Sequence, residues 1–276
     1  MSYLANFHHQ FYGPENGRKW IFIHGLMGFG QNWRRIISGL EQTERCLAYD
    51  QRGHGRSFKP ETGYSPEDYA DDLKKIVDEL GWKKFILVGH SMGGRNVLVF
   101  AAKYPQYVEK LVIEDIGPEA AANASEYYEY LLNLAPTPFP NRDEARRFFA
   151  EDFVQNAKTR ENVEVMSKFF YSNMEEQPDG TLDWRFSKNA IIESVKAGRN
   201  IDRWQEVKAL KMPTLLIRGE HSKELSHETY QEMLASNPLI KGVEIAGAGH
   251  WVHSDQVQAF VQALKSFVGD FPASEK

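Results

Sequence analysis

The chain lacks most of the features that mark membrane, nucleic-acid-binding and disulfide-bonded proteins. Its 276 residues contain one cysteine, Cys46, so no intrachain disulfide can form. Lys and Arg number 33 against 38 Asp and Glu, the formal net charge is -5, and no basic block occurs. The longest apolar run, near 97–102, is far too short to cross a bilayer, and residues 1–10 show no signal-peptide pattern. We therefore expect a cytoplasmic protein with no nucleic-acid partner, no membrane insertion and a buried Cys46 thiol.

What the chain has is an alternation of short apolar strands with longer helical patterns. This order is typical of a mostly parallel sheet with helices on both faces, and no internal repeat interrupts it. A helix is predicted from Ser65, which can cap it with Asp68 as the partner of a capping box, to Gly81, which ends it. The tail, 272–276, is expected to be frayed.

The pentapeptide at 89–93 reads G-H-S-M-G, directly after the apolar run 85–88 and directly before a helical pattern that runs to about Tyr104. A serine becomes a useful nucleophile when a tight strand-to-helix turn holds it exposed, and glycines must flank such a turn. Ser91 is therefore the candidate nucleophile. A glycine-rich turn with an incidental serine is the alternative.

A histidine that could activate this serine lies far along the chain. His250 follows the strand-like segment 243–245 and precedes a helical run, which places it on a loop at the carboxyl end of a strand. It is the candidate base, with a structural loop histidine as the alternative. Trp251 is a possible pocket residue, and His253 is predicted to lie at the pocket rim or on the surface.

The loop that begins with His24 and Gly25 follows another apolar strand, 20–23. A loop in this place can supply one backbone donor of an oxyanion hole, and the residue after the nucleophile supplies the other. The expected donors are the N–H groups of Leu26 and Met92. The His24 side chain is expected to hold the turn and is a possible pocket residue.

These segments, together with the D-Q-R-G-H-G-R-S sequence at 50–57, resemble the α/β-hydrolase fold family over nearly the whole chain. The resemblance implies a mostly parallel central sheet with helices on both faces and an inserted helical cap. The 50–57 segment is interpreted as a structural turn. Ser91 stands where the dehalogenase and epoxide hydrolase branches of the family have Asp, which argues against those two chemistries.

The acid of the expected triad departs from the family's commonest pattern. Many members place Asp three residues beyond the Gly that ends the seventh strand, and here that position is Ser222. The family's alternative place follows the sixth strand, where Asp115 stands in the required order between serine and histidine. Asp115 is therefore the predicted acid, with Glu114 and Glu220 as alternatives. Ser222 is expected to line the pocket, to hydrogen-bond the triad or to be a plain loop serine.

The alternation of strands and helices stops between 118 and 204, where helical patterns dominate. We expect residues 1–117 and 205–276 to form the hydrolase core, and 118–204 a helical cap inserted over the active site. The aromatic residues of the insertion are interpreted as cap core.

Three helices are expected within this insertion. They span 142–155, opened by a capping box of Asn141 and Glu144; 160–172, capped by Thr159; and 187–196.

The family resemblance implies a serine hydrolase that cleaves small carboxylic esters or thioesters through an acyl-enzyme, with no metal or cofactor. Its expected partner is a small-molecule substrate. A carbon–carbon bond hydrolase of the same fold and a weakly catalytic ligand sensor are the alternatives. Acyl length, leaving group and oligomeric state do not follow from the sequence.

Overall fold

The computed structural model describes residues 2–121, 123–160 and 162–269. Its centre is a seven-stranded sheet in the order β1-β3-β2-β4-β5-β8-β9. The edge strand β1 pairs antiparallel with β3, and the other pairs are parallel. The strands are β1 (His9–Tyr12), β2 (Arg18–Ile23), β3 (Glu44–Tyr49), β4 (Phe85–His90), β5 (Val108–Glu114), β8 (Thr214–Gly219) and β9 (Ile240–Ile245).

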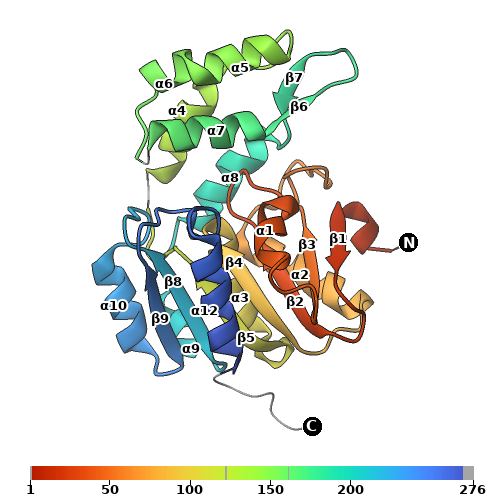
Figure 1. Cartoon of the computed structure of the whole chain (residues 1–276), viewed down its shortest axis with the longest axis vertical. Helices are drawn as coiled ribbons and strands as arrows, with labels where there is room; N and C mark the ends of the chain where they lie inside the picture. Colours follow the sequence, from red (N-terminus) through yellow and green to blue (C-terminus); the bar gives the residue numbers. More distant parts are fainter. Residues whose placement is uncertain (1, 122, 161, 270–276) are drawn as a thin grey trace.

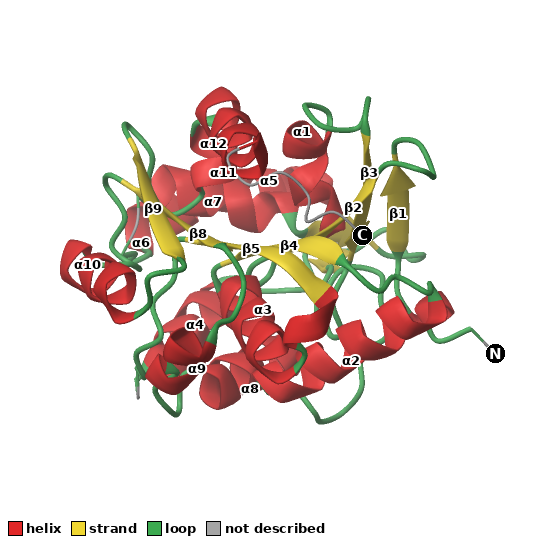
Figure 2. Ribbon diagram, turned by 90° about the horizontal axis from the view of Figure 1, so that it is seen from below, coloured by secondary structure: helices red, strands yellow, loops and turns green. Residues whose placement is uncertain are grey.

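Helices cover both faces of this sheet (Figure 2). Side chains of α2, α3, α9 and α10 pack in one apolar core, and those of α1, α11 and α12 pack in a second core on the opposite face. Their bounds are α1 (Arg34–Ile37), α2 (Pro66–Glu79), α3 (Met92–Lys103), α9 (Trp204–Ala209), α10 (His227–Ser236), α11 (Val252–Asp255) and α12 (Val257–Gly269). Short 3-10 helices span Leu4–Asn6, Gly30–Trp33 and Pro105–Tyr107.

The central strands are buried on both sides, as a parallel sheet requires. Every residue of β4 is buried, and β5 is buried except for one position. Cys46 lies inside β3 and is buried, as expected, and burial raises the pKa of its thiol to about 12. The predicted mostly parallel sheet with helices on both faces is confirmed.

The helix predicted from Ser65 is confirmed as α2. The Ser65 hydroxyl accepts from the Asp68 N–H at 3.2 Å, and the Asp68 carboxylate accepts from the Ser65 N–H at 2.9 Å. Gly81 follows the helix with φ +66°, a left-handed conformation that suits glycine at a helix end. These local bonds satisfy N–H groups that a helix start leaves without partners.

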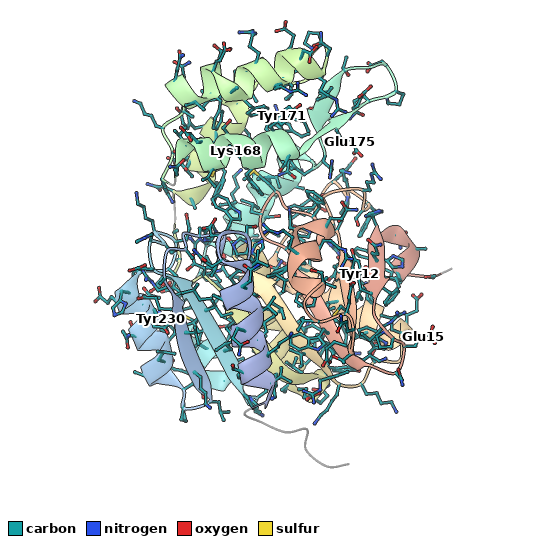
Figure 3. The ribbon with its side chains drawn as sticks, in the orientation of Figure 1. Tyr12, Glu15, Lys168, Tyr171, Glu175 and Tyr230 are labelled. Carbon is teal, nitrogen blue, oxygen red and sulfur yellow. The ribbon has the colours of Figure 1, made fainter. Side chains whose placement is uncertain are left out.

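The segment between β5 and β8 rises above the carboxyl ends of the strands (Figure 1). It has its own apolar core, in which aromatic side chains such as Phe149 and Phe170 pack with aliphatic ones. A hydrogen bond of 2.9 Å joins Glu175 of this segment to Arg56 on the sheet side, and Figure 3 labels Glu175. The elements are α4 (Ala124–Leu134), α5 (Arg142–Ala150), α6 (Asp152–Asn156), α7 (Val163–Ser172), β6 (Met174–Glu176), β7 (Leu182–Trp184) and α8 (Lys188–Gly198).

Two of the predicted helices in this segment need correction. The helix expected over 142–155 is divided into α5 and α6, because Glu151 between them has φ -118° and ψ -71°. Asn141 caps α5 as predicted, since its side chain accepts from the Glu144 N–H at 2.9 Å.

The helix expected over 160–172 begins later, and the cap at Thr159 is wrong. Its true cap is Asn162, whose amide oxygen accepts from the N–H groups of Glu164 and Val165. The third helix, expected over 187–196, spans Lys188–Gly198, and the Ser187 side chain caps it by accepting from the Ala190 N–H. The predicted frayed tail, 272–276, lies outside the described residues.

Over the described ranges, no helix is both long enough and apolar enough to cross a membrane.

Candidate active site

Ser91 occupies a strained turn between β4 and α3. Its backbone has φ 54° and ψ -120°, a conformation that non-glycine residues rarely adopt. A Cβ atom at Gly89 would lie 2.4 Å from the Gly93 carbonyl oxygen, and one at Gly93 would lie 2.5 Å from that of His24. The G-x-S-x-G spacing thus has a steric cause, since the turn brings backbone segments together where no side chain fits.

The structure brings Ser91, His250 and Asp115 together from three loops at the carboxyl edge of the sheet. His250 Nε2 lies 3.0 Å from Ser91 Oγ, and His250 Nδ1 lies 2.8 Å from Asp115 Oδ2. Asp115 is fully buried and His250 nearly so. A carboxylate, an imidazole and a hydroxyl in this order can move the hydroxyl proton to the imidazole.

The Asp115 carboxylate is held by further donors. Its Oδ1 accepts from the Gly219 N–H at 3.0 Å, and its Oδ2 accepts from the Ser222 hydroxyl. Its backbone has φ 52°, and its own N–H donates to the Ile217 carbonyl at 2.8 Å. Ser222 was expected to line the pocket, to hydrogen-bond the triad or to be a plain loop serine, and its hydroxyl donates a hydrogen bond to Asp115.

The two alternative acids contact other groups. Glu220 accepts from the Gly247 N–H at 2.8 Å. Glu114 is fully buried, and its carboxylate accepts from both the backbone N–H and Nδ1 of His253, at 2.9 and 2.8 Å. The prediction of a surface position for His253 is therefore wrong, because its pairing with Glu114 leaves the residue 4% exposed; it lines a cavity beside His90 and Trp251.

The N–H groups of Leu26 and Met92 are the two donors predicted for an oxyanion hole. Within the described part of the chain, neither donates to a protein acceptor. Met92 is the first residue of α3, so its N–H lies at the positive end of the helix dipole. Met27, with φ 60°, turns the first loop beside Leu26. Met27, Ser91 and Asp115 are the non-glycine residues with positive φ in the described ranges, and all three lie at this site.

Two buried histidines hold the loops in place. His24 Nδ1 donates to the Gly25 carbonyl at 2.8 Å, and its Nε2 accepts from the Gln51 N–H at 2.9 Å. His90 Nε2 donates to the His250 carbonyl at 2.9 Å. Burial lowers the pKa of His24 to about 4, and burial followed by the neighbouring histidines lowers the pKa of His90 well below its ordinary value. Both imidazoles are neutral at pH 7 and act as hydrogen-bond links between loops.

A possible metal-ligating group lies behind the histidine loop. Ligand atoms of His90, Glu114 and His253 lie within 4.8 Å of one another, and all three residues are buried. All three side chains already make hydrogen bonds within the protein: Glu114 accepts from His253, and His90 donates to the His250 carbonyl. The donor set is that of a hydrogen-bonded network that anchors the loop carrying His250.

The 50–57 segment is a hydrogen-bonded turn, in keeping with its interpretation as structural. The Asp50 carboxylate accepts from the N–H groups of Gly30 at 2.7 Å and Arg56 at 2.9 Å. A Cβ atom at Gly55, where φ is +52°, would lie 1.9 Å from that carboxylate. Hence the turn ties the Asp50 strand end to the loop after β2.

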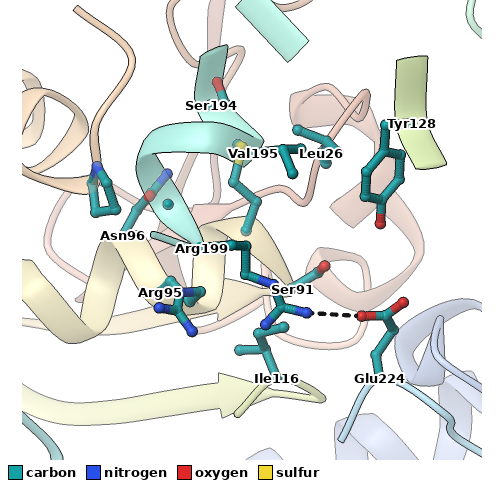
Figure 4. Close-up of a pocket in the computed structure, with 13 residues that line it drawn as sticks. Leu26, Ser91, Arg95, Asn96, Ile116, Tyr128, Ser194, Val195, Arg199 and Glu224 are labelled. Carbon is teal, nitrogen blue, oxygen red and sulfur yellow. Dashed lines mark hydrogen bonds and ion pairs between the residues drawn. The ribbon is translucent and has the colours of Figure 1, made fainter. Parts of the chain in front are cut away.

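Two adjoining cavities open at Ser91. One, of about 30 Å³, is lined by Leu26, His250 and Trp251 together with residues of α4 and α7. The other, of about 40 Å³, lies between α3 and α8 (Figure 4).

Four polar residues of the second cavity were missed in the sequence. They are Arg95, Tyr128, Arg199 and Glu224. Arg95 could have been found, because it lies one helical turn beyond Ser91 in a helix that the sequence predicts. The other three come from segments that only the fold brings together.

Comparison with known proteins agrees with this architecture. A family model described as the alpha/beta hydrolase fold matches residues 21–257. The chain is 29% identical over 267 residues to an sn-1-specific diacylglycerol lipase of Danio rerio, covering 94% of this chain and 80% of the relative. It is also 29% identical over 254 residues to 2-(acetamidomethylene)succinate hydrolase of Mesorhizobium japonicum, covering 92% and 88%. A crystal structure of E-2-(acetamidomethylene)succinate hydrolase matches with a TM-score of 0.80, 28% identity and 95% coverage of each chain.

The chain belongs to the α/β-hydrolase fold family, as its sequence motifs and its sheet both indicate. Relatives named as esterases, lipases and hydrolases support a hydrolase.

Proposed function

We propose that this protein is a serine hydrolase that cleaves small carboxylic esters or thioesters through an acyl-enzyme. The observation that carries the proposal is the unbroken hydrogen-bonded chain from Asp115 through His250 to Ser91, at 2.8 and 3.0 Å. In this mechanism His250 Nε2 takes the Ser91 proton as Oγ attacks the substrate carbonyl, and Asp115 stabilises the imidazolium.

The tetrahedral oxyanion would be held by the Leu26 and Met92 N–H groups. As the intermediate collapses, His250 gives its proton to the departing alkoxide or thiolate, which leaves Ser91 acylated. A water molecule then attacks the acyl-enzyme with His250 again as base, and free acid and serine are regenerated. Every proton in this sequence is carried by His250, so no metal or cofactor is required.

The proposal also gives the two parts of the chain separate tasks. Residues 1–117 and 205–276 would form the core that holds the reacting groups, and 118–204 a cap that shapes the substrate cavity. The cap residue Arg199 and the core residue Glu224 line one cavity at Ser91, which supports this division. We place the protein in the reducing cytoplasm because its one cysteine, Cys46, is a buried thiol.

Replacement of the nucleophile tests the proposal. Ser91→Ala should lower ester turnover by about 10⁴-fold or more and leave the fold intact, because it removes the attacking atom. A fluorophosphonate probe should label Ser91 in the wild type, as mass spectrometry of tryptic peptides would reveal. Ser222→Ala is the matched control, and it should still be labelled at Ser91. Retained turnover in Ser91→Ala, or labelling at Ser222, would contradict the assignment.

A further inference from the structure

The cavities at Ser91 are lined by more positive than negative side chains. Arg95, Arg199 and Glu224 line the cavity between α3 and α8, and Figure 4 shows the Arg199–Glu224 ion pair next to Ser91. The adjoining cavity contains Arg160 and the same Glu224. Three arginines and one carboxylate residue therefore line these cavities, in a chain whose net charge is -5. Such local excess of one sign at a cavity favours a ligand of the opposite sign.

Arg95 has no carboxylate partner among the described residues. It is 3% exposed, its Nη atoms donate only to backbone carbonyls, and its Nε is buried without a hydrogen-bond partner. Burial, followed by the charges of Arg199 and Arg203, lowers the pKa of Arg95 to about 9. Glu119 and Asp202 act on Arg95 only as nearby charges, so its guanidinium, which hydrogen-bonds to carbonyls alone, can attract an anion that enters the cavity. The three carbonyls belong to Gly117, Glu119 and Ile201.

Arg199 has donors to spare. Its Nη2 donates to Glu224 at 3.2 Å, and within the described residues its guanidinium makes no other hydrogen bond. Its side chain is 18% exposed, so Nη1 and Nε remain for a second acceptor. The hydroxyl of Tyr128 lines the same cavity and likewise has no partner in the described ranges. Burial raises the pKa of Tyr128, which keeps this hydroxyl protonated as a donor.

The position of the arginines indicates which part of a substrate they contact. His250 must protonate the leaving group, so the leaving group lies in the cavity that His250 lines. The cavity with Arg95 and Arg199 adjoins Ser91, Leu26 and Met92 but is not lined by His250. It therefore lies on the acyl side of the scissile bond.

On the basis of the proposed function, we propose that the acyl group of the substrate carries a second carboxylate, bound by Arg199 and the Tyr128 hydroxyl beside Arg95. The substrate class is then a monoester or monothioester of a short dicarboxylic acid. The cavity is small, about 40 Å³, so it favours an acyl chain of only a few carbons.

Two p-nitrophenyl esters with the same leaving group test this inference. The hemiester of glutaric acid carries the second carboxylate, whereas the pentanoate ester has a methyl group in its place. The wild type should hydrolyse the glutarate ester with a kcat/KM roughly 10- to 100-fold higher, the usual effect of a charge-assisted hydrogen bond. Arg199→Gln should lower this ratio at least about tenfold, and Arg199→Lys should lower it less, because lysine keeps the charge but loses the planar fork.

Arg147→Gln is the matched control, since Arg147 is an exposed arginine on the α5 helix that lines neither cavity, and it should keep the wild-type ratio. A wild type that prefers the pentanoate ester, or an Arg199→Gln ratio equal to that of the wild type, overturns the inference and leaves the proposed function standing. If neither ester is hydrolysed, the proposed function fails. Calorimetric titration of glutarate into the wild type and into Arg199→Gln then tests the anion site independently of turnover. Binding to the wild type that Arg199→Gln loses supports the site. Absence of binding to the wild type overturns it.

Discussion

At the scale of single residues, the site depends on which carboxylate faces His250. Glu114 and Asp115 are neighbours in the chain, yet the first holds His253 and the second holds His250. Asp115 has a positive φ, so its side chain does not continue the alternation of β5. Its carboxylate accepts a hydrogen bond from the Gly219 N–H. Two adjacent acids thus support two different histidines.

Replacing the acid by its amide should separate these roles. Asp115→Asn should lower ester turnover by about 10⁴-fold, because an amide cannot offset the imidazolium charge and favours the wrong tautomer of His250. Ser222→Ala removes one hydrogen bond to the acid and should cost about tenfold or less. Kinetics on one activated ester, with circular dichroism to verify folding, measures both effects. Glu220→Gln is the control and should retain most activity; the opposite ranking of Asp115→Asn and Glu220→Gln would place the acid after β8.

At the scale of elements, the loop after β2 must keep its backbone close to the turn at Ser91. A Cβ atom at Gly25 would lie 2.7 Å from His90 Nδ1 and 3.2 Å from Ser91 Cβ. The His90 ring is buried and bonded to the His250 carbonyl, so it cannot move aside easily. The short distance therefore sets the position of the next N–H, that of Leu26.

A larger side chain in this loop should displace that N–H. Gly25→Val should lower turnover by roughly 10²-fold, comparable with the loss of one oxyanion donor. Leu26→Ala keeps the backbone and should cost much less. Steady-state kinetics on the same ester gives the comparison, and a larger loss in Leu26→Ala would show that this loop acts through its side chains instead.

At the scale of the whole molecule, buried neutral histidines link stability to pH. Burial lowers the pKa of His24 to about 4, and burial followed by the charge of His24 lowers that of His54 to about 3. In the unfolded chain both would titrate near their ordinary value of 6.5. The unfolded state consequently binds more protons as pH falls below about 6.5, and the folded state loses stability down to about pH 4 through His24 and about pH 3 through His54.

This linkage predicts an acid-sensitive fold. Each such histidine should lower the free energy of unfolding by up to about 1.4 kcal/mol per pH unit within that window. Urea unfolding at pH 7, 6 and 5 measures how steeply the free energy of unfolding changes with pH. His54→Asn should reduce this slope by the equivalent of about one bound proton. His221→Asn alters an exposed histidine and should keep the wild-type slope. Equal slopes in all three proteins would show that His54 is protonated in the folded state.

The sequence by itself determined the features that depend on neighbouring residues. Glycines at 89 and 93 are required by close backbone approach, and they predicted the turn at Ser91. The caps at Ser65 and Asn141 are bonds between residues three apart, which the sequence displays directly. Alternating apolar segments likewise predicted the layered sheet, because burial on both faces requires them.

Only the tertiary structure decided the features that depend on contacts between segments far apart in the sequence. The burial of His253 follows from a contact with Glu114, 139 residues away, which no local pattern reveals. The cap of α7 is Asn162 and not the predicted Thr159. Both residue types can cap a helix, so the local sequence does not choose between them. The arginines of the Ser91 cavity come from separate helices, so their joint charge arises only when α8 is placed over α3. Local bonds can be read along the chain, whereas the partner of a buried charge is set by the whole fold.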